Sequence, residues 1–202
     1  MKGDGLPMAA CRPPKSRSPR ADILPMDIVR FAPQYLEAIV ELALRAWAPV
    51  FESLEQALGG ELFHVMHQPD WQTVQRRAVE QACSAAEAET WVAVGRLGVP
   101  GNPDTAAAER KAHSNQPLGF TVLHYDTAER LGIVHMIAVD PAHQRKGIAT
   151  ALMDHAADRM KSAGMNIVMV ETGGDPGHAP ARATYESLGY QPLPVVQYYR
   201  RL

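Results

Sequence analysis

The chain has 202 residues, of which 46% are hydrophobic and 21% charged, and its formal net charge is −2. This length suits one domain with a proper core, and no apolar run approaches the roughly 20 residues that a membrane-spanning helix needs. The two cysteines, Cys11 and Cys83, have neither metal-ligand nor redox spacing, which argues against a disulfide scaffold. We therefore expect a protein of the reducing cytoplasm with no membrane partner.

Charge is distributed unevenly along the chain. Residues 1–25 carry a net charge of +3, which leaves −5 for the remainder. This segment is rich in Pro, Ser and Arg, lacks the apolar stretch of a secretory signal, and has too little apolar surface to become ordered. We expect a disordered basic leader over 1–25 and a folded domain over 26–202. A basic tail that touches nucleic acid is the alternative, but the acidic body argues against a DNA-reading domain, so no nucleic-acid partner is expected.

Hydrophobic periodicity and turn residues predict the elements of the domain. Strands are expected at 28–31, 90–97, 118–125, 131–139, 166–172 and 195–200. Helices are expected at 33–47, 53–67, 69–86, from after Gln144 to 163, and at 179–188. Pro49 is expected to break or kink the first helix, Gly59-Gly60 to weaken the second, and 98–116 to form a long exposed loop. Antiparallel strands followed by a β-α-β-α-β order predict an α/β fold with helices flanking a mixed sheet.

One strand-to-helix turn carries the strongest chemical signal. The apolar run 133–139 stops at Asp140-Pro141, and a helical period follows. The start of a helix leaves backbone N–H groups without partners, and together with the helix dipole they form an anion site. Gly147 lets a ligand approach the backbone closely, while Arg145 and Lys146 add positive charge. The turn therefore predicts a site for a phosphate or a pyrophosphate.

The pattern Gln144-x-x-Gly147-x-Ala149 resembles the Q/R-x-x-G-x-G/A signature of the GNAT N-acetyltransferase superfamily. Residues 181–190 resemble the closing N-x-x-A-x-x-x-Y-E-x-x-G-F unit of the same family, with one departure: His178 stands where the family usually has Asn. The resemblance covers about residues 26–202 and is specific over about 131–190. It implies a GNAT-like fold, in which helices flank a central, mixed, mostly antiparallel sheet.

The resemblance also implies acetyl-CoA as the acyl donor. In the family this turn holds the pyrophosphate, and the backbone of the preceding strand binds the pantetheine arm; the amide of Val139 would also serve as an oxyanion donor. His178 replaces an Asn that normally makes a side-chain contact, so it is a cofactor-binding candidate too. The cofactor-binding candidates are therefore Ile137, Ala138, Val139, Gln144, Arg145, Lys146, Gly147, Ile148, Ala149, Thr150 and His178.

Acetyl transfer from a thioester to an amine needs a proton for the departing thiolate. In the family, the Tyr at the position of Tyr185 points to the thioester sulfur. A phenol can protonate a thiolate, so Tyr185 is the candidate acid. The alternative is a core tyrosine whose hydroxyl binds a backbone carbonyl.

Three candidates for the base that deprotonates the amine remain open. Glu171 matches a Glu that is a proposed base in protein N-terminal acetyltransferases of this superfamily, although it can equally form an ion pair at a strand end. His135 titrates in a useful range but lies in an apolar run, where histidines are often core residues. His178 can shuttle protons through water or simply cap the next helix.

These features predict an N-acetyltransferase that moves an acetyl group from acetyl-CoA to a primary amine of a small molecule, by direct attack in a ternary complex. The alternatives are an enzyme that acetylates a protein or peptide N-terminus and a non-catalytic acyl-CoA-binding module. His64 and His67 suit one helix face, but no third ligand is spaced with them, so no metal is expected. Because family members often dimerise, a homodimer is the default expectation.

Overall fold

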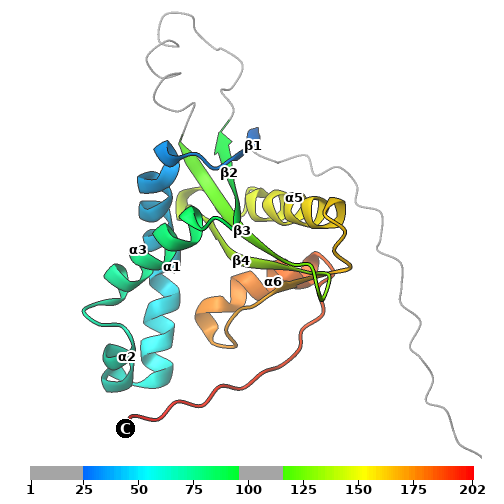
Figure 1. Ribbon diagram of the computed structural model, residues 1–202. Helices are drawn as coiled ribbons and strands as arrows, with labels where there is room; N and C mark the ends of the chain where they lie inside the picture. Colours follow the sequence, from blue (N-terminus) through cyan, green and yellow to red (C-terminus); the bar gives the residue numbers. More distant parts are fainter. Residues whose placement is uncertain (1–24, 96–115) are drawn as a thin grey trace, which may run out of the picture.

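The computed structural model describes residues 25–95 and 116–202, and shows one five-stranded sheet with helices packed against it (Figure 1). The strands are β1 (Met26–Arg30), β2 (Glu89–Gly95), β3 (Pro117–Asp126), β4 (Leu131–Val139) and β5 (Ile167–Val170). The helices are α1 (Leu36–Leu58), α2 (Gly60–Met66), α3 (Trp71–Ser84), α5 (Ile148–Ser162) and α6 (Ala179–Ser187), with short 3-10 turns at Pro33–Tyr35, Pro141–His143 and Pro176–His178. The expected leader and the expected loop at 98–116 lie outside the described residues, apart from Pro25 and Gln116.

The strands follow one another across the sheet in the order β1-β2-β3-β4-β5. The first four are mutually antiparallel, and β5 lies parallel to β4. The β3–β4 pair is a hairpin whose register shifts between Val122 and Leu123, so that His135 of β4 has no partner on β3. This mixed, mostly antiparallel sheet confirms the predicted fold class.

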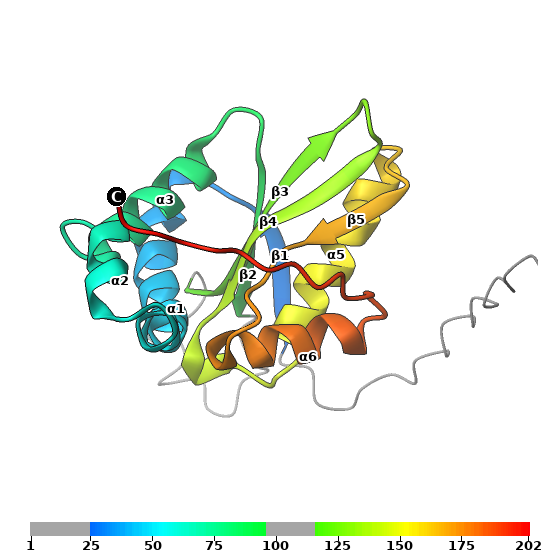
Figure 2. The same ribbon diagram turned by 90° about the horizontal axis from the view of Figure 1, so that it is seen from below.

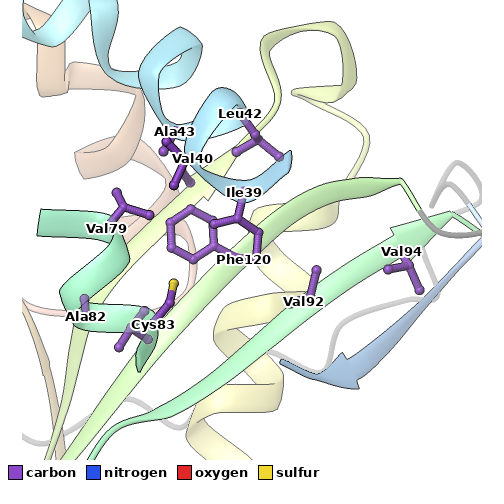
Figure 3. Packing of buried hydrophobic residues seen from close by; sticks show 12 residues of the cluster. Ile39, Val40, Leu42, Ala43, Val79, Ala82, Cys83, Val92, Val94 and Phe120 are labelled. Carbon is purple, nitrogen blue, oxygen red and sulfur yellow. The ribbon is translucent and has the colours of Figure 1, made fainter. Parts of the chain in front are cut away.

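The two faces of the sheet carry different helices (Figure 2). On one face α1 and α3 pack against β2 and β3, with Phe120 fully buried among Ile39, Val79 and Cys83 (Figure 3). On the other face α5 and α6 pack against β3 and β4 through a second cluster that includes Leu123. Successive side chains of a strand point to opposite faces, so β3 contributes apolar side chains to the core on each face of the sheet.

A partly buried carboxylate holds α5 on the second face. Glu89 accepts hydrogen bonds from Arg159 Nε at 2.7 Å, from Trp91 Nε1 at 2.8 Å and from the Tyr125 hydroxyl at 3.0 Å. Burial raises the pKa of Glu89, but these donors lower it more, so the pKa lies below its ordinary value. The charge is therefore retained, and it fixes the C-terminal half of α5 on the sheet.

The first helix differs from the expectation, because α1 runs without interruption through Pro49 to Leu58. A proline removes one backbone hydrogen bond, but α1 buries residues on both sides of Pro49, from Ile39 to Phe51, and this packing outweighs the loss. The helix ends at Gly59, whose φ of 79° suits glycine, and α2 follows at once. The third helix starts as expected, with the Asp70 side chain accepting from the Thr73 N–H.

The strand expected at 195–200 is wrong, because the structure has no strand beyond α6. Pro192 and Pro194 lack the N–H that a ladder needs, and the segment runs from α6 toward α2 with Val195 and Tyr198 exposed (Figures 1 and 2). In the parts of the chain that the structure describes, no helix combines the length and the apolar character that crossing a bilayer requires.

We expect Gly119→Ala to destabilise the fold, since the added Cβ would lie 2.8 Å from the Ala138 carbonyl oxygen and 3.2 Å from side chains of Ile148 and Leu152. Overpacking at this crossing of β3, β4 and α5 should lower the free energy of unfolding by about 1–3 kcal/mol in urea denaturation. Gly60→Ala is the control, because its Cβ would make only ordinary contacts. Equal stabilities of the two variants would contradict the packing described here.

Candidate functional site

The site begins where β4 and β5 separate. Their pairing ends at Val134 and Val170, and beyond this point β4 continues alone to Val139 beside β3. Backbone groups of residues 135–139 that face away from β3 therefore have no ladder partner on β5. A cavity of about 710 Å³ occupies the opening, between α1, the N-terminus of α5, and the loop that leads into α6. Residues 134–139 of β4 all line it.

The N-terminus of α5 forms one end of the cavity. Gly147 precedes the helix in the left-handed conformation, with φ 81°, and no side chain caps it. The first intrahelical bond runs from the Ala151 N–H to the Gly147 carbonyl. The N–H groups of residues 148–150 are thus left without helical partners at the positive end of a 15-residue helix, and these residues line the cavity. This geometry suits a bound anion.

The side chains of the turn before α5 differ in whether they line the cavity. Gln144 and Arg145 line the cavity, and Gln144 Nε2 donates to the Val139 carbonyl at 3.2 Å. Lys146 Nζ instead donates to the Ala142 carbonyl at 3.0 Å, and Lys146 does not line the cavity. Arg145 is thus the cation of this turn that the structure brings to the site.

An ion pair fixes this turn to α1. Arg45 Nη2 lies 2.6 Å from Asp140 Oδ2, while Asp140 Oδ1 accepts the Ala142 N–H at 2.9 Å. Burial raises the pKa of Asp140, but hydrogen bonds from Arg45 and Ala142 lower it more, so it lies below the ordinary value. Arg45 and its contact with Asp140 were not expected from the sequence, since the two residues lie 95 positions apart.

Tyr185 lies on α6 with its ring buried and lines the cavity. Burial, with a smaller effect from Tyr190, raises the pKa of Tyr185 to about 12. The phenol is therefore protonated throughout the neutral range. No hydrogen bond to its hydroxyl is present within the described residues, so the backbone-carbonyl alternative is not what the structure shows.

The other catalytic candidates also reach the cavity. Glu171, just after β5, is exposed and lines the cavity without an ion-pair partner among the described residues. His135 lines it from the irregular position of β4, with its ring centroid 4.8 Å from that of His124. Desolvation of the ring, followed by the charge of His124, lowers the pKa of His135 below 6.5, so it is neutral at pH 7.

His178 lines the cavity from the turn before α6, where its Nδ1 lies 2.5 Å from Asp175 Oδ1. The Gly177 N–H donates both to Asp175 Oδ2 and to Ser53 Oγ of α1, at 3.0 Å each. Sequence reasoning missed Asp175 and Ser53. A signal was available for Asp175, since Asp-Pro before a 3-10 turn occurs at Asp140 as well, but none was available for Ser53, which lies 124 positions from Gly177.

The middle of α1 forms one wall of the cavity, with Trp47 and Val50 among its residues. Trp47 also packs edge-on against Phe120, at 6.3 Å between ring centroids, so it belongs to both core and cavity wall. Across residues 25–95 and 116–202, no group of three or more His, Cys, Asp or Glu side chains is arranged to hold a metal ion.

The model of the acetyltransferase (GNAT) family matches residues 61–190, which is more than half of the chain. The chain belongs to the GNAT acetyltransferase family. Among solved structures, an aminoglycoside N-acetyltransferase in complex with CoA superposes with a TM-score of 0.54 at 17% identity, covering 92% of this chain and 99% of that one. At this identity the likeness shows the fold.

Curated relatives match over shorter stretches. Mycothiol acetyltransferase of Nocardia farcinica is 29% identical over 128 residues, which is 62% of this chain and 39% of that protein. The [ribosomal protein bS18]-alanine N-acetyltransferase of Escherichia coli is 36% identical over 63 residues, which is 31% of this chain and 41% of that enzyme. The match thus spans about two fifths of each of these relatives.

The Asp140 contact predicts a pH dependence. Because the folded-state pKa of Asp140 lies below its ordinary value of 3.8, the pair contributes stability at neutral pH that is lost as the pH falls through that range. Arg45→Ala should lower the free energy of unfolding at pH 7 by about 1 kcal/mol, since Arg45 is half exposed, and should make the decline toward acid shallower. Urea titrations at several pH values measure both effects.

Lys161→Ala, which removes an exposed cation of α5, is the control and should keep the wild-type pH dependence of stability. The same pH dependence in both variants would refute the assignment of this effect to the pair of Arg45 and Asp140.

Proposed function

We propose that the protein transfers an acetyl group from acetyl-CoA to a primary amine of a small molecule, by direct attack in a ternary complex. One observation carries the proposal: a single cavity joins the uncapped N-terminus of α5 to Tyr185 and Glu171. Family membership supplies the chemistry, and the cavity brings together the groups that this chemistry needs.

The donor end would bind the pyrophosphate of acetyl-CoA. The free N–H groups of residues 148–150 and the side chain of Arg145 provide the donors. The pantetheine arm would lie along residues 137–139 of β4, where the backbone has no partner from β5 and can form strand-like hydrogen bonds. The thioester would then lie between β4 and Tyr185.

The acceptor end favours a cation. Glu171 contributes an exposed carboxylate, which would attract a protonated amine into the cavity. After the amine loses a proton, its lone pair attacks the thioester carbonyl, a C–N bond forms, and the C–S bond breaks. Tyr185, which is protonated at neutral pH, donates a proton to the departing sulfur.

No covalent enzyme intermediate is proposed. Among the described residues the one cysteine is Cys83, which is buried in the α1–α3 core and does not line the cavity. Burial raises the pKa of the Cys83 thiol to about 12, so it is a poor nucleophile at neutral pH.

Release of free CoA thiol tests the function directly. Acetyl-CoA is mixed with the protein and a panel of amines, comprising aminoglycosides, amino sugars and short peptides, and the thiol is detected with a chromogenic disulfide. We expect release with at least one small amine. Peptides are included because the match to the bS18-alanine N-acetyltransferase favours a peptide N-terminus as the second acceptor class. Binding of acetyl-CoA without release by any amine would support the acyl-CoA-binding module instead.

Two neighbouring cations should differ in their effect on acetyl-CoA. Arg145→Ala should weaken acetyl-CoA binding about tenfold in calorimetry, because a charge-assisted contact to the pyrophosphate is lost. Lys146→Ala is the matched control and should change affinity less than about twofold, since Lys146 is held at the Ala142 carbonyl away from the cavity. If the two variants lose affinity equally, the anion site is placed wrongly.

Tyr185→Phe should lower kcat about 100-fold while leaving the affinity for acetyl-CoA within about threefold, because only the proton for the sulfur is removed. Tyr190→Phe is the control: its ring centroid lies 6.1 Å from that of Tyr185, but it does not line the cavity. Wild-type turnover of the Tyr185 variant would withdraw the acid role.

A further inference from the structure

We infer that His178, oriented by Asp175, is the general base that takes the proton of the acceptor amine as it attacks acetyl-CoA. This inference rests on the proposed acetyl transfer. It starts from the separation of 2.5 Å between His178 Nδ1 and Asp175 Oδ1, in a loop that forms part of the cavity wall.

Asp175 is placed as a hydrogen-bond acceptor. Its side chain is only 9% exposed, and Oδ2 accepts the Gly177 N–H at 3.0 Å. Burial raises the pKa of Asp175, but hydrogen bonds with Ser53 and His178 lower it more, so it lies below its ordinary value. The carboxyl is therefore ionised and can only accept, which means that His178 Nδ1 carries the hydrogen between them.

This contact defines the state of the ring. A neutral imidazole with hydrogen on Nδ1 has its lone pair on Nε2. Nε2 of His178 has no partner among the described residues and is not one of their buried unpaired polar atoms. His178 lines the same cavity as Tyr185 and Glu171. Because Asp175 holds Nδ1, Nε2 is the ring nitrogen left to accept a proton from a bound substrate. A carboxylate behind an imidazole both orients it and stabilises the imidazolium that forms.

The loop is held so that the ring keeps this position. Arg182 Nη1 donates to the carbonyls of Gly173 and Asp175, at 2.5 Å and 2.8 Å. A Cβ on Gly173 would lie 2.5 Å from His178 Nδ1, and a Cβ on Gly177 would lie 2.9 Å from the backbone of Val50. Both glycines are therefore needed for the loop to pack this closely, and a base held in advance loses little entropy at the reaction.

The chain contains its own comparison. Asp140-Pro141-Ala142-His143 repeats the pattern Asp175-Pro176-Gly177-His178, and both form a 3-10 turn started by the Asp side chain. In the first turn Asp140 forms an ion pair with Arg45. His143 Nδ1 lies 3.8 Å from Asp140 Oδ1, and His143 does not line the cavity. The close His–Asp contact at the second turn is therefore not a by-product of the local sequence.

The other base candidates lack this arrangement. Glu171 has no group among the described residues that orients it. His135 lies beside His124, with 4.8 Å between their ring centroids, whereas His178 lies beside the carboxylate of Asp175. In the proposed step the amine nitrogen bonds to the carbonyl carbon and gives a proton to His178 Nε2. The C–S bond then breaks, the sulfur receives the Tyr185 proton, and His178 returns its proton through solvent while Tyr185 regains one.

The first test compares two variants of the full chain with the amine that the thiol assay identifies. His178→Asn installs the residue that the family usually has at this position, so it should preserve a cofactor contact but not a base. We expect kcat to fall about 100-fold or more, with the calorimetric affinity for acetyl-CoA within about threefold of wild type. His143→Asn, the matched control in the other turn, should keep wild-type kcat. Unchanged acetyl-CoA binding reports that each variant is folded.

Asp175 is tested as a positioning residue by a double-mutant cycle. Asp175→Asn alone should lower kcat about tenfold, but in the His178→Asn background it should change kcat less than about twofold, which a merely structural role would not produce. If the wild type is active and His178→Asn keeps kcat within threefold of it, the base role is overturned and the proposed function stays intact. A wild-type protein that releases no thiol with any amine would instead remove both.

Discussion

The separation of β4 from β5 is the constraint on which the rest of the site depends. Up to Val134 and Val170 the two strands pair, and β4 has a neighbour on each side. Beyond these residues β5 gives way to a loop, and β4 keeps β3 as its single neighbour. The freed edge, the cavity and the convergence of the α5 and α6 N-terminal turns on one opening all follow from that loss of pairing. A backbone edge is costly to bury unpaired, so a ligand that completes it is favoured.

Much of the fold was predictable because its signals are local. Apolar runs bounded by turn residues predicted the strands at 118–125 and 131–139, and the Asp140-Pro141 stop followed by Gly147 predicted the start of α5. The same turn predicts an anion site, because the start of a helix leaves N–H groups free in any protein, and this stays a prediction. The two predictions that were wrong concern segments whose structure depends on packing rather than on local sequence. α1 continues through Pro49 because its apolar residues are buried on both sides, and no strand forms around Val195 because that segment is exposed.

Sequence patterns pointed to residues that line the cavity, but not to the contacts that these residues and their supports make. Tyr185, Glu171, His135 and His178, each singled out on different grounds, all line the cavity, while their roles stay predictions. Lys146 does not, because its side chain returns to the Ala142 carbonyl, a choice that the sequence of a turn does not fix. Contacts between distant positions were also out of reach. No periodicity pairs Arg45 with Asp140 or Ser53 with Gly177, yet these contacts decide where both loops sit.

Both of those contacts come from one helix. Arg45 holds the turn before α5, Ser53 holds the turn before α6, and eight residues, or about 12 Å of α1, separate them. Pro49 lies between, where the helix lacks a backbone hydrogen bond. A tilt of α1 at this point would change the position of one turn relative to the other. Because both turns line the same cavity, a ligand that shifted one turn would shift the other through α1, and by thermodynamic reciprocity two such ligands would alter each other's affinity to the same degree.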